Sequence, residues 1–132
     1  MSDVNKKAKR ILVVDDKKNI RILLNELLSG MGYRVLEAKD GKEAMGVVEV
    51  GPIDLVMTDL KMPDMDGIQL TRAIRRIRPN LPIIVYSAHR FIDTAPAALK
   101  AGANDYLAKP FLRTKIEQAV ERLLKEQEES SI

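Results

Sequence analysis

Five polar residues stand at the ends of short apolar runs in this sequence, and their side chains are of the types that phosphoryl transfer uses. They are Asp15, Asp16, Asp59, Ser87 and Lys109. Phosphoryl transfer requires positioned cations and hydrogen-bond donors around the phosphoryl oxygens more than covalent chemistry by the protein. A lysine and a hydroxyl supply such donors, and an aspartate can receive the group as an acyl phosphate. The five residues therefore indicate a site that carries a phosphoryl group.

The three aspartates also indicate a divalent cation. If their runs are neighbouring strands, the carboxylates repel one another, and the pKa of at least one rises unless a cation lies between them. Mg²⁺ prefers a few carboxylates together with water, and it bridges readily to phosphate oxygens. We therefore expect Asp15, Asp16 and Asp59 to bind Mg²⁺ or Mn²⁺, with Asp59 as the phosphoacceptor because it ends the central strand.

Each of these residues also has a purely structural interpretation. An aspartate after a strand is a common helix cap or turn residue, a serine can end a strand, and a lysine can be a surface charge. Five such residues together at the ends of successive strands favour the functional interpretation, because clustered titratable groups mark functional sites.

The elements that position these residues follow from the apolar periods along the chain. Five short runs predict strands, namely residues 10–14, 34–38, 54–58, 83–87 and 105–108. Apolar stripes with the helical period lie between them. This alternation predicts an α/β fold, a parallel sheet with helices on both faces. We expect a doubly wound, flavodoxin-like (βα)5 arrangement with strand order 2-1-3-4-5, whose ligands bind at the carboxyl ends of the strands.

Local residues mark two helix starts. Asp40 and Glu43 predict a capping box at the start of the second helix. Pro96 must lie in the first turn of the fourth helix to be tolerated, with Asp93 or Thr94 as its cap.

Length and composition indicate one domain. The chain has 132 residues and no cysteine, which excludes disulfides, thiolate metal sites and a cysteine nucleophile and agrees with a reducing cytoplasm. No segment resembles a signal peptide or a membrane span, so we expect a cytoplasmic protein without membrane contact. We divide it into a basic N-terminal extension (1–9), the domain (10–126) and a fraying polar tail (127–132).

The net charge of +3 and the pI near 9.2 raise the question of nucleic-acid binding. The basic residues lie mainly in the N-terminal ten and at positions 72–78, with few aromatic residues among them to stack on bases. We interpret them as a hydrated surface. Five βα units leave no helix-turn-helix module, so we expect no direct nucleic-acid binding.

Three segments resemble the response regulator receiver family, and the receivers of the chemotaxis regulators within it. They are a V-V-D-D run at 13–16, a D-x-x-M-P-x-x-D-G motif within 54–67, and a segment at 102–111 that ends in K-P-F. Their order and spacing span nearly the whole chain. The resemblance implies a receiver domain of a two-component phosphorelay that takes a phosphoryl group from a phosphohistidine of a sensor histidine kinase or histidine phosphotransfer protein. Phosphorylation would then switch a surface that binds an unknown downstream protein.

The resemblance also implies a metal ligand set. Asp16 and Asp59 would ligate Mg²⁺ directly, the backbone carbonyl of Lys61 would be a third ligand, and Asp15 would act largely through water.

The phosphoryl group and the switch involve further residues by the same resemblance. Ser87 would supply the hydroxyl, and Lys109, aimed by a cis peptide bond to Pro110, would contact the phosphoryl group. Ala88 is small and would leave the site reachable. Tyr106 would be the switch aromatic, whose ring turns inward as Ser87 moves, although a half-buried strand tyrosine is the structural alternative.

Two other functions with a similar sheet agree less well with the sequence. A magnesium phosphohydrolase with an aspartyl-phosphate intermediate usually has a second aspartate two residues after the nucleophile, where this chain has Lys61. A flavin or dinucleotide binder needs a phosphate loop after the first strand, where residues 15–18 are Asp-Asp-Lys-Lys. We therefore expect no enzyme, apart from assistance with its own phosphorylation and dephosphorylation. The polar C-terminus favours a stand-alone module, and a receiver cut from a longer regulator or hybrid kinase is a close alternative. We expect a monomer or a weak phosphorylation-dependent dimer.

Overall fold

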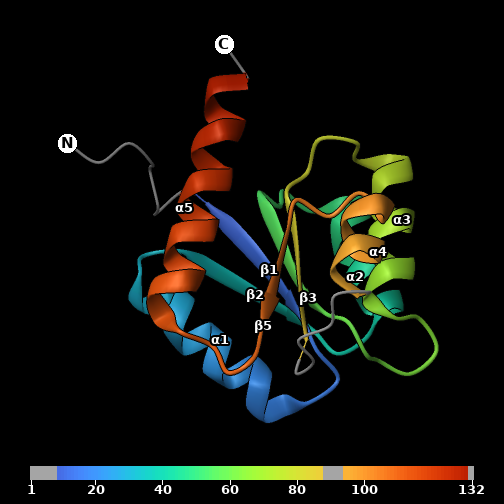
Figure 1. The fold of residues 1–132 in the computed structure, drawn as a ribbon, viewed down its shortest axis with the longest axis horizontal. Helices are drawn as coiled ribbons and strands as arrows, with labels where there is room; N and C mark the ends of the chain where they lie inside the picture. The colour runs from blue at the N-terminus through green and yellow to red at the C-terminus, as the bar shows by residue number, and fades with distance from the viewer. Residues whose placement is uncertain (1–8, 88–93, 131–132) are drawn as a thin grey trace.

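The computed structural model describes residues 9–87 and 94–130 of the chain. The predicted alternation of strands and helices is confirmed. The elements are β1 (Arg10–Val14), α1 (Lys18–Gly30), β2 (Arg34–Ala38), α2 (Gly41–Val50), β3 (Leu55–Asp59), α3 (Gly67–Ile77), β4 (Ile83–Ser87), α4 (Thr94–Ala101), β5 (Asp105–Ala108) and α5 (Arg113–Ser130). All strand pairs are parallel, in the predicted order β2-β1-β3-β4-β5. Helices α1 and α5 cover one face, and α2, α3 and α4 cover the other (Figure 1).

The sheet separates two hydrophobic cores. Ile11 and Val13 of β1 pack on the side of α1 and α5, whereas Leu12 and Val14 pack on the side of α2, α3 and α4. All four side chains are fully buried, and each such side chain contributes about 1.5–3 kcal/mol of hydrophobic free energy. Because both faces of the sheet are covered, polar groups can gather only at the ends of the strands.

The third strand begins one residue later than the sequence predicts. The carboxylate of Asp54 accepts the Arg10 N–H at 2.8 Å. The side chain of Asp54 thus replaces a backbone carbonyl as the acceptor in the β1–β3 ladder. Regular pairing starts at Leu55, and Asp59 is the last residue of β3 rather than the first residue after it. Asp59 therefore lies opposite Tyr86 in the β3–β4 ladder.

The capping box predicted for α2 forms only in part. The Asp40 carboxylate accepts the Glu43 N–H at 2.8 Å, but the Glu43 carboxylate accepts the N–H of Lys39 at 2.9 Å rather than that of Asp40. A complete capping box instead starts α3, where the side chains of Asp66 and Gln69 each accept the other's backbone N–H. An N-cap of this kind contributes about 1 kcal/mol.

The last two helices correct the sequence analysis at their ends. Within the described residues α4 begins at Thr94, so Pro96 lies in its first turn as predicted, and Thr94 is helical rather than the cap. The other candidate cap, Asp93, lies outside the described residues, as do residues 1–8 of the proposed extension. The polar tail predicted from residue 127 is helical in its described part, because α5 continues to Ser130 through residues with high helix propensity. Within the described ranges, no helix is both long and apolar enough to cross a membrane.

Candidate functional site

Three carboxylates meet at the carboxyl ends of β1 and β3, as predicted. One oxygen from each of Asp15, Asp16 and Asp59, here called the carboxylate cluster, lies within 4.8 Å of the others. Asp15 and Asp59 are buried and Asp16 is exposed. Oxygens bound to one Mg²⁺ at about 2.1 Å lie about 3–4 Å apart, so small side-chain movements would bring this donor set around the ion. The cluster fits Mg²⁺ or Mn²⁺.

Asp15 is held from several sides. One carboxylate oxygen accepts the backbone N–H of Lys17 at 2.8 Å, and the other accepts the hydroxyl of Tyr86 at 2.9 Å. The guanidinium of Arg21 donates to the backbone carbonyl of Asp15 at 2.7 Å. Asp15 is therefore not the N-cap of α1, a position that Lys17 occupies, and its carboxylate has a defined orientation.

The surroundings of Asp59 destabilise its charged form. Its side chain is 3% exposed, and burial raises its pKa above the ordinary value, with a further increase from the charge of Asp15. Smaller opposing effects come from Lys109, Lys17 and the backbone N–H of Leu60. A raised carboxyl pKa means that the negative charge is poorly compensated by the protein alone. A bound divalent cation or a change to an uncharged side chain would relieve this strain.

The backbone around Asp59 is packed against the start of α3. A Cβ atom on Gly67 would overlap the Asp59 carbonyl oxygen, and the Gly67 N–H donates to the Leu60 carbonyl at 2.7 Å. In the connecting loop, Asp64 has a φ of 69°, a left-handed conformation that aspartate adopts more easily than most residues. Glycine at 67 therefore allows the close approach that sets the position of Asp59.

Lys109 directly follows β5 and Ser87 ends β4, and the charge of Lys109 acts on Asp59. The Lys109 N–H donates to the Ser87 carbonyl at 2.7 Å, and the Lys109–Pro110 peptide bond is cis, as the resemblance implied. The Lys109 ammonium lies 5.4 Å from the ring centroid of Tyr86 and 5.9 Å from that of Phe111. Ser87 is 1% exposed at the end of β4. Their proposed contacts with a phosphoryl group stay predictions.

The remaining predicted residues are Tyr106, Lys61 and Ala88. Tyr106 is half-buried on β5, and its hydroxyl lies 3.0 Å from the hydroxyl of Thr94 at the start of α4. Lys61 is exposed two residues after Asp59, and the role of its carbonyl as a ligand stays a prediction. Ala88 lies outside the described residues.

Sequence reasoning missed Tyr86. It lies within the predicted strand 83–87 and was given no role of its own, yet its hydroxyl contacts Asp15. The available signal was positional, because Tyr86 directly precedes Ser87 and faces Asp59 once β3 and β4 are in register. Strand bounds do not define the register between β3 and β4, so the signal was not visible in the sequence.

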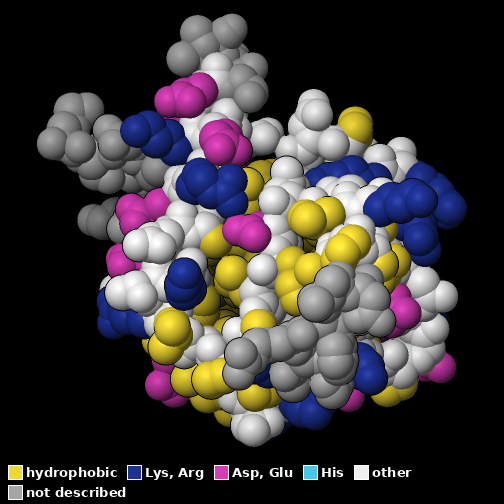
Figure 2. Space-filling model, viewed as in Figure 1, with side chains coloured by type: hydrophobic (Ala, Val, Ile, Leu, Met, Phe, Trp, Pro, Cys, Tyr) yellow, Lys and Arg dark blue, Asp and Glu magenta, His cyan; other side chains and the backbone are white. Residues whose placement is uncertain are grey.

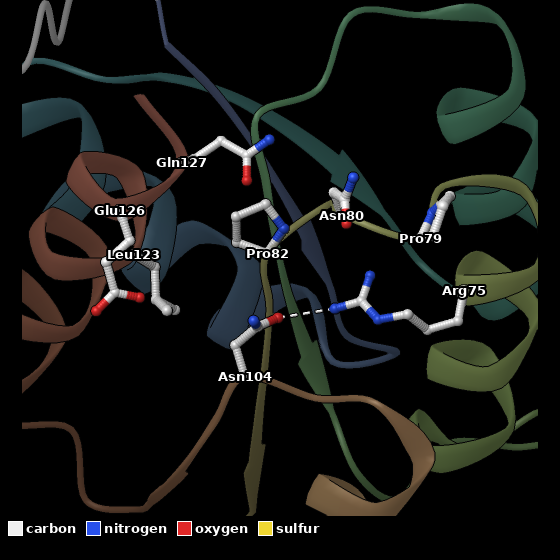
Figure 3. Close-up of a pocket in the computed structure, with 8 residues that line it drawn as sticks. All are labelled: Arg75, Pro79, Asn80, Pro82, Asn104, Leu123, Glu126 and Gln127. Carbon is white, nitrogen blue, oxygen red and sulfur yellow. Dashed lines mark hydrogen bonds between the residues drawn. The ribbon is translucent and has the colours of Figure 1, made fainter. Parts of the chain in front are cut away.

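A groove at the opposite end of the sheet is lined by residues that connect two loops. Its volume is about 360 Å³, and its lining includes Pro82 and Asn104, which precede β4 and β5 (Figure 3). Arg75 donates from here to the Asn104 side chain at 2.8 Å and to the Leu81 carbonyl at 2.6 Å. The basic residues beside α3 (Figure 2) are therefore not all a hydrated surface, since Arg75 holds two loops together.

Comparison with known proteins adds independent evidence. A model of the response regulator receiver domain matches residues 11–121. Transcriptional regulatory protein ZraR of Klebsiella oxytoca is 44% identical over 100 residues, which are 76% of this chain and 23% of that protein. Sporulation initiation phosphotransferase F of Bacillus subtilis (strain 168) is 37% identical over 115 residues, 87% of this chain and 93% of that protein.

A solved structure is also similar. The crystal structure of response regulator protein TrrA from Thermotoga maritima, in complex with Mg(2+)-BeF, has a TM-score of 0.81 and 36% sequence identity. It covers 87% of this chain and 98% of the other. This chain thus spans about a quarter of the length of ZraR and nearly all of the other two proteins.

Proposed function

Since this chain belongs to the response regulator receiver family of two-component systems, a family of signalling domains, we propose that it accepts a phosphoryl group from a phosphohistidine onto Asp59. The observation that carries this proposal is the carboxylate cluster, with oxygens within 4.8 Å of one another and a raised pKa at the buried Asp59. In a site of this kind a bound cation reduces the repulsion between the carboxylates, and the destabilised carboxylate of Asp59 is a candidate for covalent modification.

The reaction uses few protein groups. A carboxylate oxygen of Asp59 forms the new O–P bond while the P–N bond to the donor histidine breaks, and the electron pair of that bond stays on the imidazole nitrogen. Asp16, Asp59 and the Lys61 carbonyl hold the metal ion in this proposal, with Asp15 bound through water. When bound, Mg²⁺ neutralises the cluster and the developing charge on the phosphoryl oxygens. Lys109 and the Ser87 hydroxyl bind the remaining oxygens.

The output of the domain is a change of surface. We propose that Ser87 moves toward the phosphoryl group and that Tyr106 then gives up its contact with Thr94 and turns inward. The face formed by α4, β5 and α5 carries hydrophobic side chains (Figure 2). Leu99 on α4 is 49% exposed, and Leu112, in the loop between β5 and α5, is 58% exposed. Exposed apolar groups of this kind suit a protein partner. We place the downstream target on this face.

The partners follow from the chemistry. A sensor histidine kinase or a histidine phosphotransfer protein is the proposed phosphoryl donor. We propose further that the chain is a monomer or a weak phosphorylation-dependent dimer, that it acts in the cytoplasm, and that it turns over no substrate besides its own acyl phosphate.

The proposal is tested by intact-mass measurement after incubation with Mg²⁺ and acetyl phosphate, a small acyl phosphate donor. We expect the mass of one added phosphoryl group, which is lost in Asp59→Asn and when EDTA removes the metal. Asp54→Asn is the matched control, because Asp54 precedes the same strand at its other end. An adduct that persists in Asp59→Asn, or that disappears in Asp54→Asn, would place the phosphoacceptor elsewhere.

A further inference from the structure

Tyr86 is a polar side chain buried beside the carboxylate cluster, and the proposed chemistry gives it no role. It is fully buried, and its hydroxyl lies 2.9 Å from an Asp15 carboxylate oxygen and 3.2 Å from the Val14 carbonyl. A phenol has one proton to donate, and an ionised carboxylate is a stronger acceptor than a carbonyl. The shorter distance agrees, so Tyr86 donates to Asp15.

The phenol is a stable donor. Burial raises the pKa of Tyr86 well above its ordinary value, and the charge of Asp15 raises it further. The phenol is therefore protonated at neutral pH and can donate to the Asp15 carboxylate 2.9 Å away.

The two donors to Asp15 fix the plane of its carboxylate. One is the Lys17 N–H in the loop after β1, and the other is Tyr86 on β4. Each carboxylate oxygen accepts one hydrogen bond from the protein and retains a lone pair for a water molecule or an ion. Without the Tyr86 hydroxyl, the carboxylate keeps a single donor, the Lys17 N–H, and can rotate away from Asp16 and Asp59.

The ring of Tyr86 has a separate contact. The Lys109 ammonium lies 5.4 Å from the ring centroid, within the range of a cation–π interaction, and Phe111 packs edge-on at 5.1 Å between centroids. Replacement by phenylalanine therefore removes the bond to Asp15 and leaves the support of Lys109 in place.

We propose that Tyr86 is a positioning residue of the metal site, whose hydroxyl holds the Asp15 carboxylate toward the cation. It acts on the affinity for the divalent cation and not on phosphoryl transfer at saturating metal. This inference rests on the proposed function in one respect, that the carboxylate cluster binds a divalent cation.

Mn²⁺ binding to the full chain, measured by electron paramagnetic resonance of the free ion, tests this role. We expect Tyr86→Phe to raise the Kd for Mn²⁺ about three- to tenfold, the equivalent of about 0.6–1.4 kcal/mol. Tyr33→Phe is the matched control, since Tyr33 is a buried tyrosine in the same hydrophobic core but lies just before β2, at the other end of the sheet. Its Kd should equal that of the wild type.

A double-mutant cycle and a kinetic measurement separate positioning from a general effect on the fold. In an Asp15→Asn background, Tyr86→Phe should change the Kd less than twofold, because its effect passes through Asp15. With acetyl phosphate, Tyr86→Phe should raise the Mg²⁺ concentration for half-maximal rate and leave the rate at saturating Mg²⁺ within about twofold. Tyr86→Leu, which also loses the ring, should show the same weaker Mn²⁺ binding.

Three results would overturn the inference. The first is an unchanged or lower Kd for Mn²⁺ in both Tyr86 variants while the wild type binds normally. The second is an equal effect of Tyr86→Phe with Asp15 or Asn at position 15. The third is a lack of Mn²⁺ binding by the wild type, which would overturn the metal site itself as well as the role of Tyr86.

Discussion

Replacement of Asp59 by asparagine should stabilise the metal-free domain at neutral pH, although it removes the proposed phosphoacceptor. At an effective dielectric constant of about 20, unit charges on Asp15 and Asp59 within 4.8 Å repel by about 3.5 kcal/mol. Lys109 and Lys17 offset part of this repulsion. We expect a net increase of about 1–2 kcal/mol in the free energy of unfolding.

The pH dependence of this effect has a definite sign. The pKa of Asp59 is higher in the folded chain than its ordinary value of 3.8, so the folded state binds more protons between the two values. Stability of the wild type therefore falls as pH rises through this window, and the penalty is complete above the folded pKa. The advantage of Asp59→Asn should be largest at neutral pH and should vanish in acid.

Metal should reverse the order of stability. A cation that binds only the folded wild type stabilises it by about 2.7 kcal/mol at about 100 times its Kd, which exceeds the expected gain from Asp59→Asn. The assay is urea denaturation at several pH values, with EDTA and with Mg²⁺. Asp64→Asn is the control, since Asp64 is exposed and asparagine also tolerates its positive φ, so its stability should stay within about 0.5 kcal/mol. If Asp59→Asn destabilises the metal-free chain at neutral pH, the carboxylate cluster is not strained as described.

Two further substitutions test the packing that supports the site. Gly67→Ala should lower the free energy of unfolding by about 1–3 kcal/mol and slow phosphorylation, because the added Cβ meets the Asp59 backbone. Its control is Gly46→Ala in α2, where the Cβ enters open space. This variant should be more stable by about 0.5–1 kcal/mol in the same urea titration. Arg75→Gln should lower the free energy of unfolding by about 2 kcal/mol, because the hydrogen bonds of Arg75 to loop carbonyls are lost. The rate of phosphorylation by acetyl phosphate should stay unchanged. A slower rate would contradict a purely structural role.

The sequence was sufficient for the architecture because its apolar periods are strong. The runs in β1 and β4 are buried on both faces and carry almost no polar side chain, and the helical stripes between them leave one arrangement that covers every apolar face. The capping pairs and the helix ends do not follow from these apolar periods. Asp40 and Asp66 both precede a glycine, and each is followed three residues later by a residue that can complete a capping box. Only Asp66 forms the complete box. The direction of the chain before each helix decides which backbone N–H the side chain of that later residue reaches.

In the candidate site, too, some residues can be identified from the sequence and others only from the structure. Asp15, Asp16 and Asp59 are visible in the sequence because polar residues at the ends of apolar strands stand out, and a parallel sheet must bring such ends to one edge. Tyr86 and Arg75 were not visible in this way. A buried tyrosine resembles any apolar strand residue, and an arginine in a basic run resembles a hydrated one, until the partners of their polar atoms are known.

The sequence by itself thus determined which carboxylates gather and on what sheet, because periodicity and strand order are properties of the chain. Only the tertiary structure decided how those carboxylates are held. The register of β3 against β4 sets Tyr86 beside Asp15, and the close approach of α3 sets the backbone of Asp59. These contacts join residues far apart in the chain, and a shift of one residue in register turns a side chain to the other face of the sheet.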